Sequence, residues 1–449
     1  MAQTHNLTEG KVSRLILKFF FPMFFTNMLQ QIYTVADTAI VGKGLGDNSL
    51  AAVGNMSSLM FLIIGFSTGM TNGFSISAAY SYGAQKYDTL RKTIASSIII
   101  SGVFSILLTV LSIIFLRDTL LMLRTSEIII DESLRYGYVI FGGLAATIAY
   151  NLCSSILRAL GDSKTPFIAI IISTVINIVL DYVLIYIVKT GVEGAAAATV
   201  FAQIISAFIC FAKIRKIDII KLHVMDFRAD QSVYLQLLKN GIPMAIMNSI
   251  TAVGCMVIQY FVNGLGIVYM SAYSACSKYI NLFIQPSCTA GNTMSSFTSQ
   301  NYGAGKYLRI KQGLYVCLGI SLISYIILGS AMCFFPRTLA GFMLNGDEQI
   351  SLAVMYLRKC GIMIFVVDFL FIFRSGCQGM GHPVVPMVSG IAEMVMRISI
   401  IVIFVSRIGF SATAYAEISA WIAALIINIL SFRYYYKGNF KYSAITYKK

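Results

Sequence analysis

Long apolar segments follow one another along almost the whole 449-residue chain, and they decide what kind of fold it can adopt. Four clear examples are 93–116, 167–188, 312–335 and 384–405. Each contains about the 20 residues that a helix needs to cross the hydrocarbon core of a bilayer. The chain is 57% hydrophobic and only 12% charged, too apolar for a water-soluble core to bury. We therefore expect an all-α integral membrane protein.

In chain order, the apolar segments predict about twelve transmembrane helices. The expected spans are 15–42, 50–80, 93–116, 135–157, 166–188, 192–212, 240–263, 270–300, 312–335, 352–377, 384–406 and 410–432. Lys11, Arg14 and Lys18 run directly into the first span, with no small-residue cleavage site before it. We expect that span to be retained rather than removed as a signal peptide.

The formal net charge of +15 would by itself be compatible with nucleic-acid binding, so the location of the 34 Lys and Arg residues matters. With the N-terminus inside, 22 of them lie in inner segments, nine in outer loops and three within spans. This bias follows the positive-inside rule, and the inner charges would meet anionic lipids. We expect both termini in the cytoplasm, contact with membrane lipids and no nucleic-acid partner.

Residue types that build metal sites and catalytic sites are sparse. The nine cysteines are scattered singly through apolar segments, and the three histidines lie near no cysteine or carboxylate at ligand spacing. This pattern predicts reduced, packed cysteines and no structural metal site. We find no Ser/His/Asp arrangement, no HExxH and no phosphate-binding Gly-rich loop. We expect a protein that is not an enzyme, uses no cofactor and is not driven directly by ATP.

The two halves of the chain repeat each other at an offset of 220 residues. YGAQK at 82–86 recurs as YGAGK at 302–306, GLG at 44–46 recurs at 264–266, and PM at 22–23 recurs at 243–244 with an offset one residue longer. Six spans separate the copies, so both enter the membrane from the same side. Parallel repeats of this kind are common in transporters, with the substrate path between the halves.

The repeat predicts two six-helix lobes. We expect an N-terminal lobe at 1–212 and a C-terminal lobe at 240–449, which ends in a short cytoplasmic tail. The most polar internal stretch, 213–239, lies between them and is predicted to be a cytoplasmic linker.

Carboxylates at membrane depth are costly and usually face a cavity or a partner, so each one is a functional candidate. At 1.5 Å per residue, Asp37, Asp181 and Thr199 lie about 9–12 Å below the outer ends of their spans. Asn177 is one turn before Asp181 on the same helix face. Such a cluster could bind Na⁺ through oxygen ligands, or hold a proton between the two carboxylates. The alternative is that the two acids cap broken helices or complete a buried network.

The second half carries a different set of ionisable residues within spans, namely Lys278, Asp368, Glu393 and Arg397. Glu393 and Arg397 are four residues apart on one helix, which favours a structural salt bridge. Asp368 lies about 14 Å deep, counted from the preceding charged residues, near the midplane where transporters usually bind substrate.

Several segments together resemble the multidrug and toxic compound extrusion family. VADTAIVG at 35–42 resembles its first-helix acid motif, VINIVLD at 175–181 its fifth-helix Asn and Asp, and GAAAAT at 194–199 its sixth-helix Thr, while LRALGD at 157–162 and QGMGHP at 378–383 are similar to its paired inner-loop motifs. The resemblance covers nearly the whole chain. It implies a V-shaped pair of lobes that export amphipathic organic cations by alternating access, in exchange for protons or sodium ions.

The resemblance also assigns roles to residues. It implies that Asp37, Asn177, Asp181 and Thr199 form the coupling-ion site, with Na⁺ the only metal ion expected. Some members have a second-lobe cation site with a glutamate early in span seven and an aspartate in span ten. Here Asn248 stands at the first position and Asp368 fits the second. With Lys278 and Glu393, these two residues are candidates for a second-lobe polar or substrate site.

We expect a monomer in the plasma (inner) membrane. The closest alternative function is a flippase for lipid-linked oligosaccharides from the same superfamily, whose substrates are large and anionic. Such proteins often have fourteen spans and a basic central cavity, whereas this sequence predicts twelve spans and intramembrane charges of both signs.

Overall fold

The computed structural model describes residues 6–122, 125–228 and 230–446, and the regular secondary structure of these residues is entirely helical. Ten helices within them are long and apolar enough to cross a membrane. The bent pair α4 (Glu127–Gly142) and α5 (Leu144–Ala159), which meet at 45°, forms an eleventh crossing. The predicted all-α membrane fold is confirmed.

The predicted span at 270–300 is built differently from the others. It consists of two helices, α9 (Ile267–Phe283) and α10 (Gln285–Gly303), and α10 is rich in Ser, Thr, Asn and Gln. Many of these side chains are buried, and the Thr289 and Thr293 hydroxyls donate to carbonyl oxygens one turn earlier, at 2.8 and 3.0 Å. Protein surrounds α10, so its polar sequence does not have to meet lipid.

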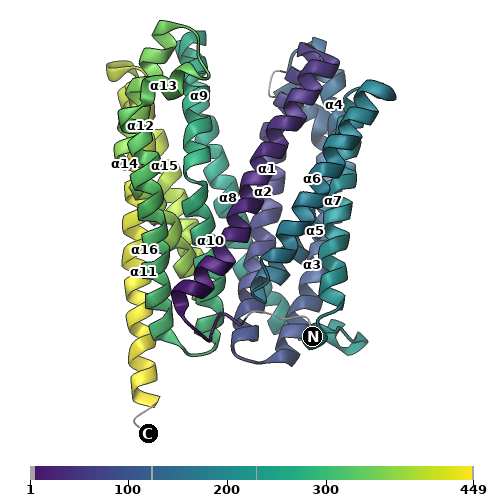
Figure 1. The fold of residues 1–449 in the computed structure, drawn as a ribbon, viewed down its shortest axis with the longest axis vertical. Coiled ribbons are helices and arrows are strands. Elements are labelled where there is room, and N and C mark those ends of the chain that lie inside the picture. The colour runs from purple at the N-terminus through teal and green to yellow at the C-terminus, as the bar shows by residue number, and fades with distance from the viewer. Residues whose placement is uncertain (1–5, 123–124, 229, 447–449) are drawn as a thin grey trace. The chain divides into compact units, whose positions relative to one another are not determined.

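The described chain divides into two compact units. Unit 1 contains Asn6 and Phe21–Ala245. Its elements (Figure 1) are most of α1 (Val12–Leu45), α2 (Asp47–Gly83), α3 (Tyr87–Met122), α4, α5, α6 (Lys164–Tyr182), the π-helix η1 (Val183–Ile187), α7 (Val192–Arg215), the 3₁₀ turns η2 (Asp218–Ile220) and η3 (Val224–Phe227), and the first part of α8 (Gln231–Leu265).

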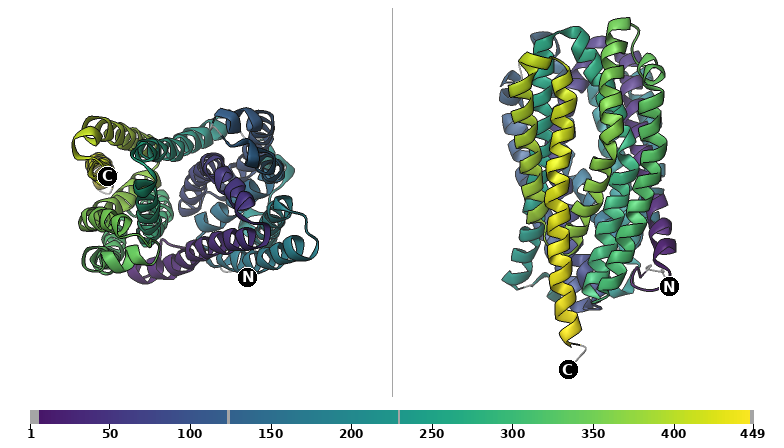
Figure 2. Two further views of the ribbon diagram at one scale, coloured as in Figure 1. Left: turned by 90° about the horizontal axis from the view of Figure 1, so that it is seen from above. Right: turned by 90° about the vertical axis from the view of Figure 1, so that its left-hand side faces the viewer.

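Unit 2 contains Leu7–Phe20 and the chain from Ile246 onward. Its remaining elements are α9, α10, α11 (Tyr307–Ser324), the π-helix η4 (Tyr325–Gly329), α12 (Ser330–Phe334), α13 (Pro336–Gly341), α14 (Asp347–Gly379), α15 (Val384–Ile408) and α16 (Ser411–Thr446). Helix α16 packs extensively against both α14 and α15 (Figure 2).

Helices α1 and α8 each contribute to both units. Helix α1 changes unit between Phe20 and Phe21, next to Pro22, and α8 changes unit just after Pro243. These two prolines are the repeat partners in the sequence. A proline inside a helix removes one backbone hydrogen bond and allows a local bend. In both halves of the repeat, a helix therefore lacks one backbone hydrogen bond close to the residue at which it passes from one unit to the other.

The internal repeat is also present in the backbone conformation. Left-handed φ angles occur in pairs at an offset of 220 residues, at Gly46 and Gly266, Gln85 and Gly305, and Gly161 and Gly381. Such angles are uncommon for a residue other than glycine, so Gln85 marks a turn that the fold imposes. The two halves therefore share the geometry of their turns as well as short sequence motifs.

The segment before α1 is bound to the turn between α10 and α11 of unit 2. The Leu7 N–H donates to the Gln300 side chain at 2.9 Å, and side chains of the turn donate to backbone carbonyls of the segment. These further contacts are Asn301 and Arg309 to Leu7 at 3.3 and 3.2 Å, Lys306 to Thr8 at 3.0 Å, and Arg309 to Gly10 at 2.9 Å. A segment from the start of the chain thus completes the second unit.

Within unit 1, helices α2 and α8 touch backbone to backbone at Gly73. A Cβ atom added to Gly73 would lie 2.5 Å from the Gly241 Cα atom and 2.5 Å from the Asn240 carbonyl oxygen. Asn240 also donates to the Ser77 hydroxyl at 2.8 Å. This contact needs glycine because no side chain fits between the two backbones.

We predict that Gly73→Ala destabilises the protein by about 1–3 kcal/mol, because the added methyl group forces α2 and α8 apart. The measurement is thermal unfolding of the purified protein in detergent. Gly102→Ala in α3 is the matched control, since a Cβ atom there meets nothing within 4 Å. Equal melting temperatures for the two variants would contradict the close contact.

Candidate functional site

The four first-half residues singled out in the sequence come together in unit 1. Asp37 lies on α1, Asn177 and Asp181 on α6, and Thr199 on α7. The carboxyl groups of Asp37 and Asp181 are hydrogen bonded to each other. Oriented with its amide nitrogen toward the acids, Asn177 donates to Asp181 Oδ2 at 2.8 Å and accepts from the Thr199 backbone N–H at 3.3 Å.

The paired carboxyl groups are enclosed by protein, with Asp37 9% and Asp181 0% exposed. A hydrogen bond between two carboxyl groups requires one proton, because two adjacent carboxylates resist ionising together in a low dielectric. Each acid also has a buried Oδ1 atom with no hydrogen-bond partner in the described residues. Unpartnered buried oxygens are costly unless a ligand satisfies them. The arrangement therefore suits a proton or a small cation with oxygen ligands.

Two tyrosines that sequence reasoning missed border the acid pair. The Tyr33 hydroxyl lies 3.0 Å from the Thr199 hydroxyl. Tyr136 on α4 is buried and close enough to interact electrostatically with both acids. Tyr33 could have been found, because it precedes Asp37 by one helical turn. Nothing in the sequence pointed to Tyr136, because it is one of 25 tyrosines and lies far from Asp37 and Asp181 along the chain.

The π-helix η1 begins directly after Tyr182, next to Asp181, and packs against the C-terminal end of α1. The Tyr186 hydroxyl donates to the Ile40 carbonyl at 3.5 Å, and a Cβ atom at Gly44 would lie 2.6 Å from Ile185 Cγ2. Single-turn π-helices within α-helices are frequent at functional sites. Here the wider turn packs against α1 in the segment that follows Asp37, which keeps the two acids adjacent.

The second-half candidates are distributed differently. Asp368 on α14 is 1% exposed and has one buried oxygen without a partner in the described chain. Lys278 on α9 is exposed, and Asn248 on α8 is half-buried. Glu393 belongs to a separate group of charges. Among these candidates, unit 2 therefore carries a buried acid without an ion-pair partner at Asp368, and a charged network around Glu393.

The ion pair that spacing predicted between Glu393 and Arg397 is confirmed, with 3.6 Å between Oε2 and Nη1. It is part of a larger network whose other members, Arg374 and Glu417, were missed. Arg374 pairs with Glu393, and Arg397 binds Glu417 Oε2 through Nη2 at 2.9 Å and Nε at 3.1 Å. All four side chains are at most 10% exposed. The network joins α14, α15 and α16 (Figure 2).

We predict that Arg374→Ala destabilises the protein by about 3–5 kcal/mol, because Glu393 loses a buried partner. The double variant Arg374→Ala/Glu393→Ala is expected to recover part of that loss, since no buried charge is left uncompensated. The measurement is thermal unfolding in detergent. Arg337→Ala is the control, because its partner Asp347 is 94% exposed and surface pairs contribute little. A single variant no less stable than the control would contradict the assigned burial.

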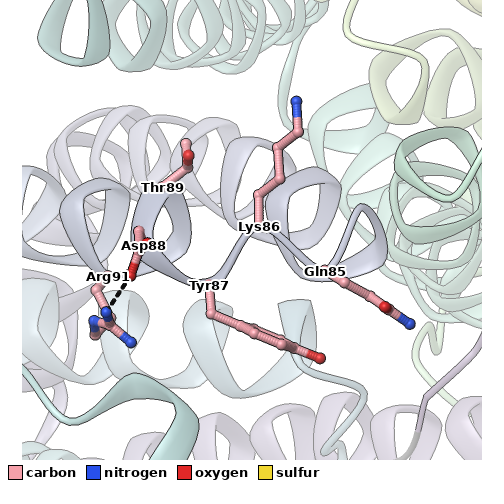
Figure 3. Close-up of a pocket in the computed structure, with 6 residues that line it drawn as sticks. All are labelled: Gln85, Lys86, Tyr87, Asp88, Thr89 and Arg91. Atoms are coloured by element: carbon pink, nitrogen blue, oxygen red, sulfur yellow. Dashed lines mark hydrogen bonds and ion pairs between the residues drawn. The ribbon is translucent and has the colours of Figure 1, made fainter.

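A hollow of about 440 Å³ lies at the turn between α2 and α3, away from the acid pair in the sequence (Figure 3). Lys86, Asp88 and Arg91 line it with three uncharged residues, and Arg91 is paired with Asp88. Arg91 Nε also lies 3.7 Å from Asp226 of the η3 turn. The cations of this hollow are thus partly neutralised, and it contains none of the predicted site residues.

Known proteins share this arrangement of the chain. The MatE family model matches residues 22–183 and 243–403, one match in each half. The chain belongs to the MatE family. This MatE protein is 28% identical to the probable multidrug resistance protein YoeA of Bacillus subtilis over 362 residues, which are 78% of this chain and 77% of that protein. It is 21% identical to the FAD transporter of Shewanella oneidensis over 407 residues, 88% of each chain.

The fold is likewise similar to that of a crystal structure of MATE in the bent conformation, with a TM-score of 0.91 and 20% identity over 98% of both chains. The MatE protein is therefore a multi-pass membrane transporter of the multidrug efflux type, with about twelve transmembrane helices in two six-helix lobes. These findings do not favour the oligosaccharide flippase.

Proposed function

We propose that this MatE protein is a secondary active antiporter that exports amphipathic organic cations in exchange for protons or sodium ions. Its coupling-ion site is formed by Asp37, Asn177, Asp181 and Thr199. The observation that carries the proposal is the buried, mutually hydrogen-bonded carboxyl pair, in which each acid keeps an oxygen without a partner.

The chemistry of the pair explains how exchange is coupled. Two carboxyl groups this close are stable with a proton, a sodium ion or an organic cation beside them, and unstable when both are ionised and alone. An inward-moving ion and an outward-moving cation therefore compete for the same negative charge. Each ligand shifts the population of access states only through its different affinity for those states. Export is then driven by the ion gradient.

In the second half, we propose that Asp368 contacts the substrate, because it is a buried carboxyl group with one unpartnered oxygen. Of the other three candidates, Lys278 is exposed, Asn248 is half-buried and Glu393 is neutralised by arginines, so their part in a polar substrate site is secondary. One relative carries FAD, which is an anion. Transport of organic cations and of flavin nucleotides should therefore be compared in the same assay.

The topology proposed from the charge distribution has both termini and the 213–239 linker in the cytoplasm. With this topology, the basic inner segments contact anionic lipids of the inner membrane of a bacterium. We also propose that the protein is a monomer. The bacterial origin of its relatives supports this location.

We predict that Asp37→Asn lowers gradient-driven extrusion of a fluorescent organic cation at least tenfold, because the amide cannot take up or release the coupling charge. The assay uses purified protein in liposomes, with either a proton or a sodium gradient imposed. The gradient that drives the parent protein identifies the ion. Asp347→Asn is the control, since this carboxylate is 94% exposed and paired only with an exposed arginine.

The result for Asp37→Asn decides the role of the acid pair. Full activity of correctly folded Asp37→Asn protein would remove Asp37 from the mechanism. Failure of the parent protein to move any organic cation, together with uptake of flavin nucleotides, would replace the proposed substrate class.

We predict that Tyr33→Phe weakens the apparent affinity for the coupling ion roughly three- to tenfold and leaves the maximal rate nearly unchanged. The Tyr33 hydroxyl lies 3.0 Å from that of Thr199, and losing one such hydrogen bond costs about 1 kcal/mol. The measurement is transport rate against ion concentration. Tyr182→Phe on α6, whose side chain is 58% exposed, is the matched control. An unchanged affinity would show that Thr199 needs no orientation by Tyr33.

A further inference from the structure

The positive-φ glycines allow the two ion-pairing regions of the repeat to be aligned residue by residue. Gly161 and Gly381 precede α6 and α15, and Gly191 and Gly409 precede α7 and α16. Counted from the first pair, Asn177 corresponds to Arg397. Counted from the second pair, Thr199 corresponds to Glu417. The coupling-ion site of unit 1 and the charged network of unit 2 thus occupy equivalent positions in the two halves.

The acids of the first site have no acidic counterpart. Asp181 corresponds to Ile401, which is fully buried. Asp37 corresponds to Val257 at the offset of 220, or to Ile258 at the offset of 221 that aligns the prolines. Two carboxyl groups that need a cation are therefore replaced by apolar side chains, and a neutral Asn–Thr contact is replaced by a charged Arg–Glu contact.

The guanidinium of Arg397 lies between two buried carboxylates. It contacts Glu417 at 2.9 and 3.1 Å and Glu393 at 3.6 Å. Its Nη1 atom would be in van der Waals contact, at 3.4 Å, with a Cβ atom at Gly254, so the guanidinium lies directly against this glycine. Gly254 corresponds, at the offset of 221, to Tyr33, which contacts Thr199 in unit 1. The place in unit 2 that corresponds to the acid pair of unit 1 therefore contains a cation, the guanidinium of Arg397, which is part of the chain.

We propose that unit 2 contains a counterpart of the coupling-ion site in which the Arg397 guanidinium permanently takes the place of the ion. One consequence is that only unit 1 binds a coupling cation. The other is that removal of the guanidinium creates a second site for a monovalent cation, Na⁺ or H⁺, between Glu393 and Glu417. The inference rests on the proposed function of Asp37 and Asp181 as the ion site of unit 1.

Other ionisable groups surround this position and have to be considered in any dependence on pH. Arg374 neutralises one side of Glu393, so Glu417 is the carboxylate that loses its partner when Arg397 is replaced. The groups that face Arg397 and Glu417 from the packed helices are Arg374, Glu393, Cys255, Tyr273, Tyr356 and Cys360.

The only tryptophan of the chain, Trp421, is a local reporter for this site. It is 3% exposed and lies one helical turn after Glu417 on α16. We would measure Trp421 fluorescence, melting temperature and cation binding per chain, as radioactive Na⁺ bound or protons taken up. Choline chloride at equal ionic strength controls for salt.

All comparisons start from Asp37→Asn, which removes the site of unit 1. We expect this protein to bind no cation. Addition of Arg397→Asn, which copies Asn177, is expected to restore one saturable site per chain, with a change in Trp421 fluorescence and a cation-dependent rise in melting temperature. Arg397→Lys, which keeps an attached charge, and Arg397→Asn/Glu417→Thr, which also copies Thr199, are expected to bind none.

Two results would overturn the inference. The first is a folded Asp37→Asn/Arg397→Asn protein that binds no cation and shows no change in Trp421 fluorescence. The second is cation binding by the Asp37→Asn protein that is lost when Glu417→Thr is added. This result needs no Arg397 variant, so it can be obtained even if the Arg397 variants do not fold. Residual binding that Glu417→Thr does not affect, with the Arg397 variants behaving as expected, would instead count against Asp37 and the proposed function.

Discussion

A charged side chain at the centre of a membrane helix costs about 2.5–3.5 kcal/mol to insert, and this cost governs the whole polar interior of the protein. Each buried charge must find a partner within the bundle. In unit 1 we propose that the two acids bind a proton or a cation, and in unit 2 two arginines pair with two glutamates. The apolar surfaces of the helices favour insertion into the bilayer, while these few groups restrict how the helices can pack around them.

The two units share the geometry of their turns but differ in the polar side chains that they bury. Their turns share left-handed residues at an offset of 220, so duplication preserved how the chain changes direction. The side chains between the helices diverged. The first unit keeps carboxyl oxygens without partners, as the proposed ion site requires, whereas the two arginines and two glutamates of the second unit neutralise one another. Substitution of a few buried side chains can therefore give two halves with the same backbone fold different functions.

The sequence predicted the membrane fold and singled out four first-half residues that the structure brings together, for physical reasons. Hydrophobic length signals a span directly, and Asp37, Asn177, Asp181 and Thr199 could be placed at one depth by counting from helix ends. Contacts between helices could not be counted in this way. Arg374 and Glu417 have their ion-pair partners on other helices, so these pairs became visible only when α14, α15 and α16 were packed together. The sequence did not predict that 270–300 divides into two helices, because α10 is stabilised by burial of its polar side chains and not by hydropathy.

The attachment of the first residues to unit 2 has a consequence for biosynthesis. Leu7 binds Gln300, 293 residues later in the chain. At about 5–20 residues per second, the ribosome needs roughly 15–60 s to make that intervening length. Throughout this interval the segment before α1 remains at the membrane surface without its partner, while the spans of unit 1 are inserted. Formation of this contact joins residues of long sequence separation, and it is therefore expected to be a slow step of folding.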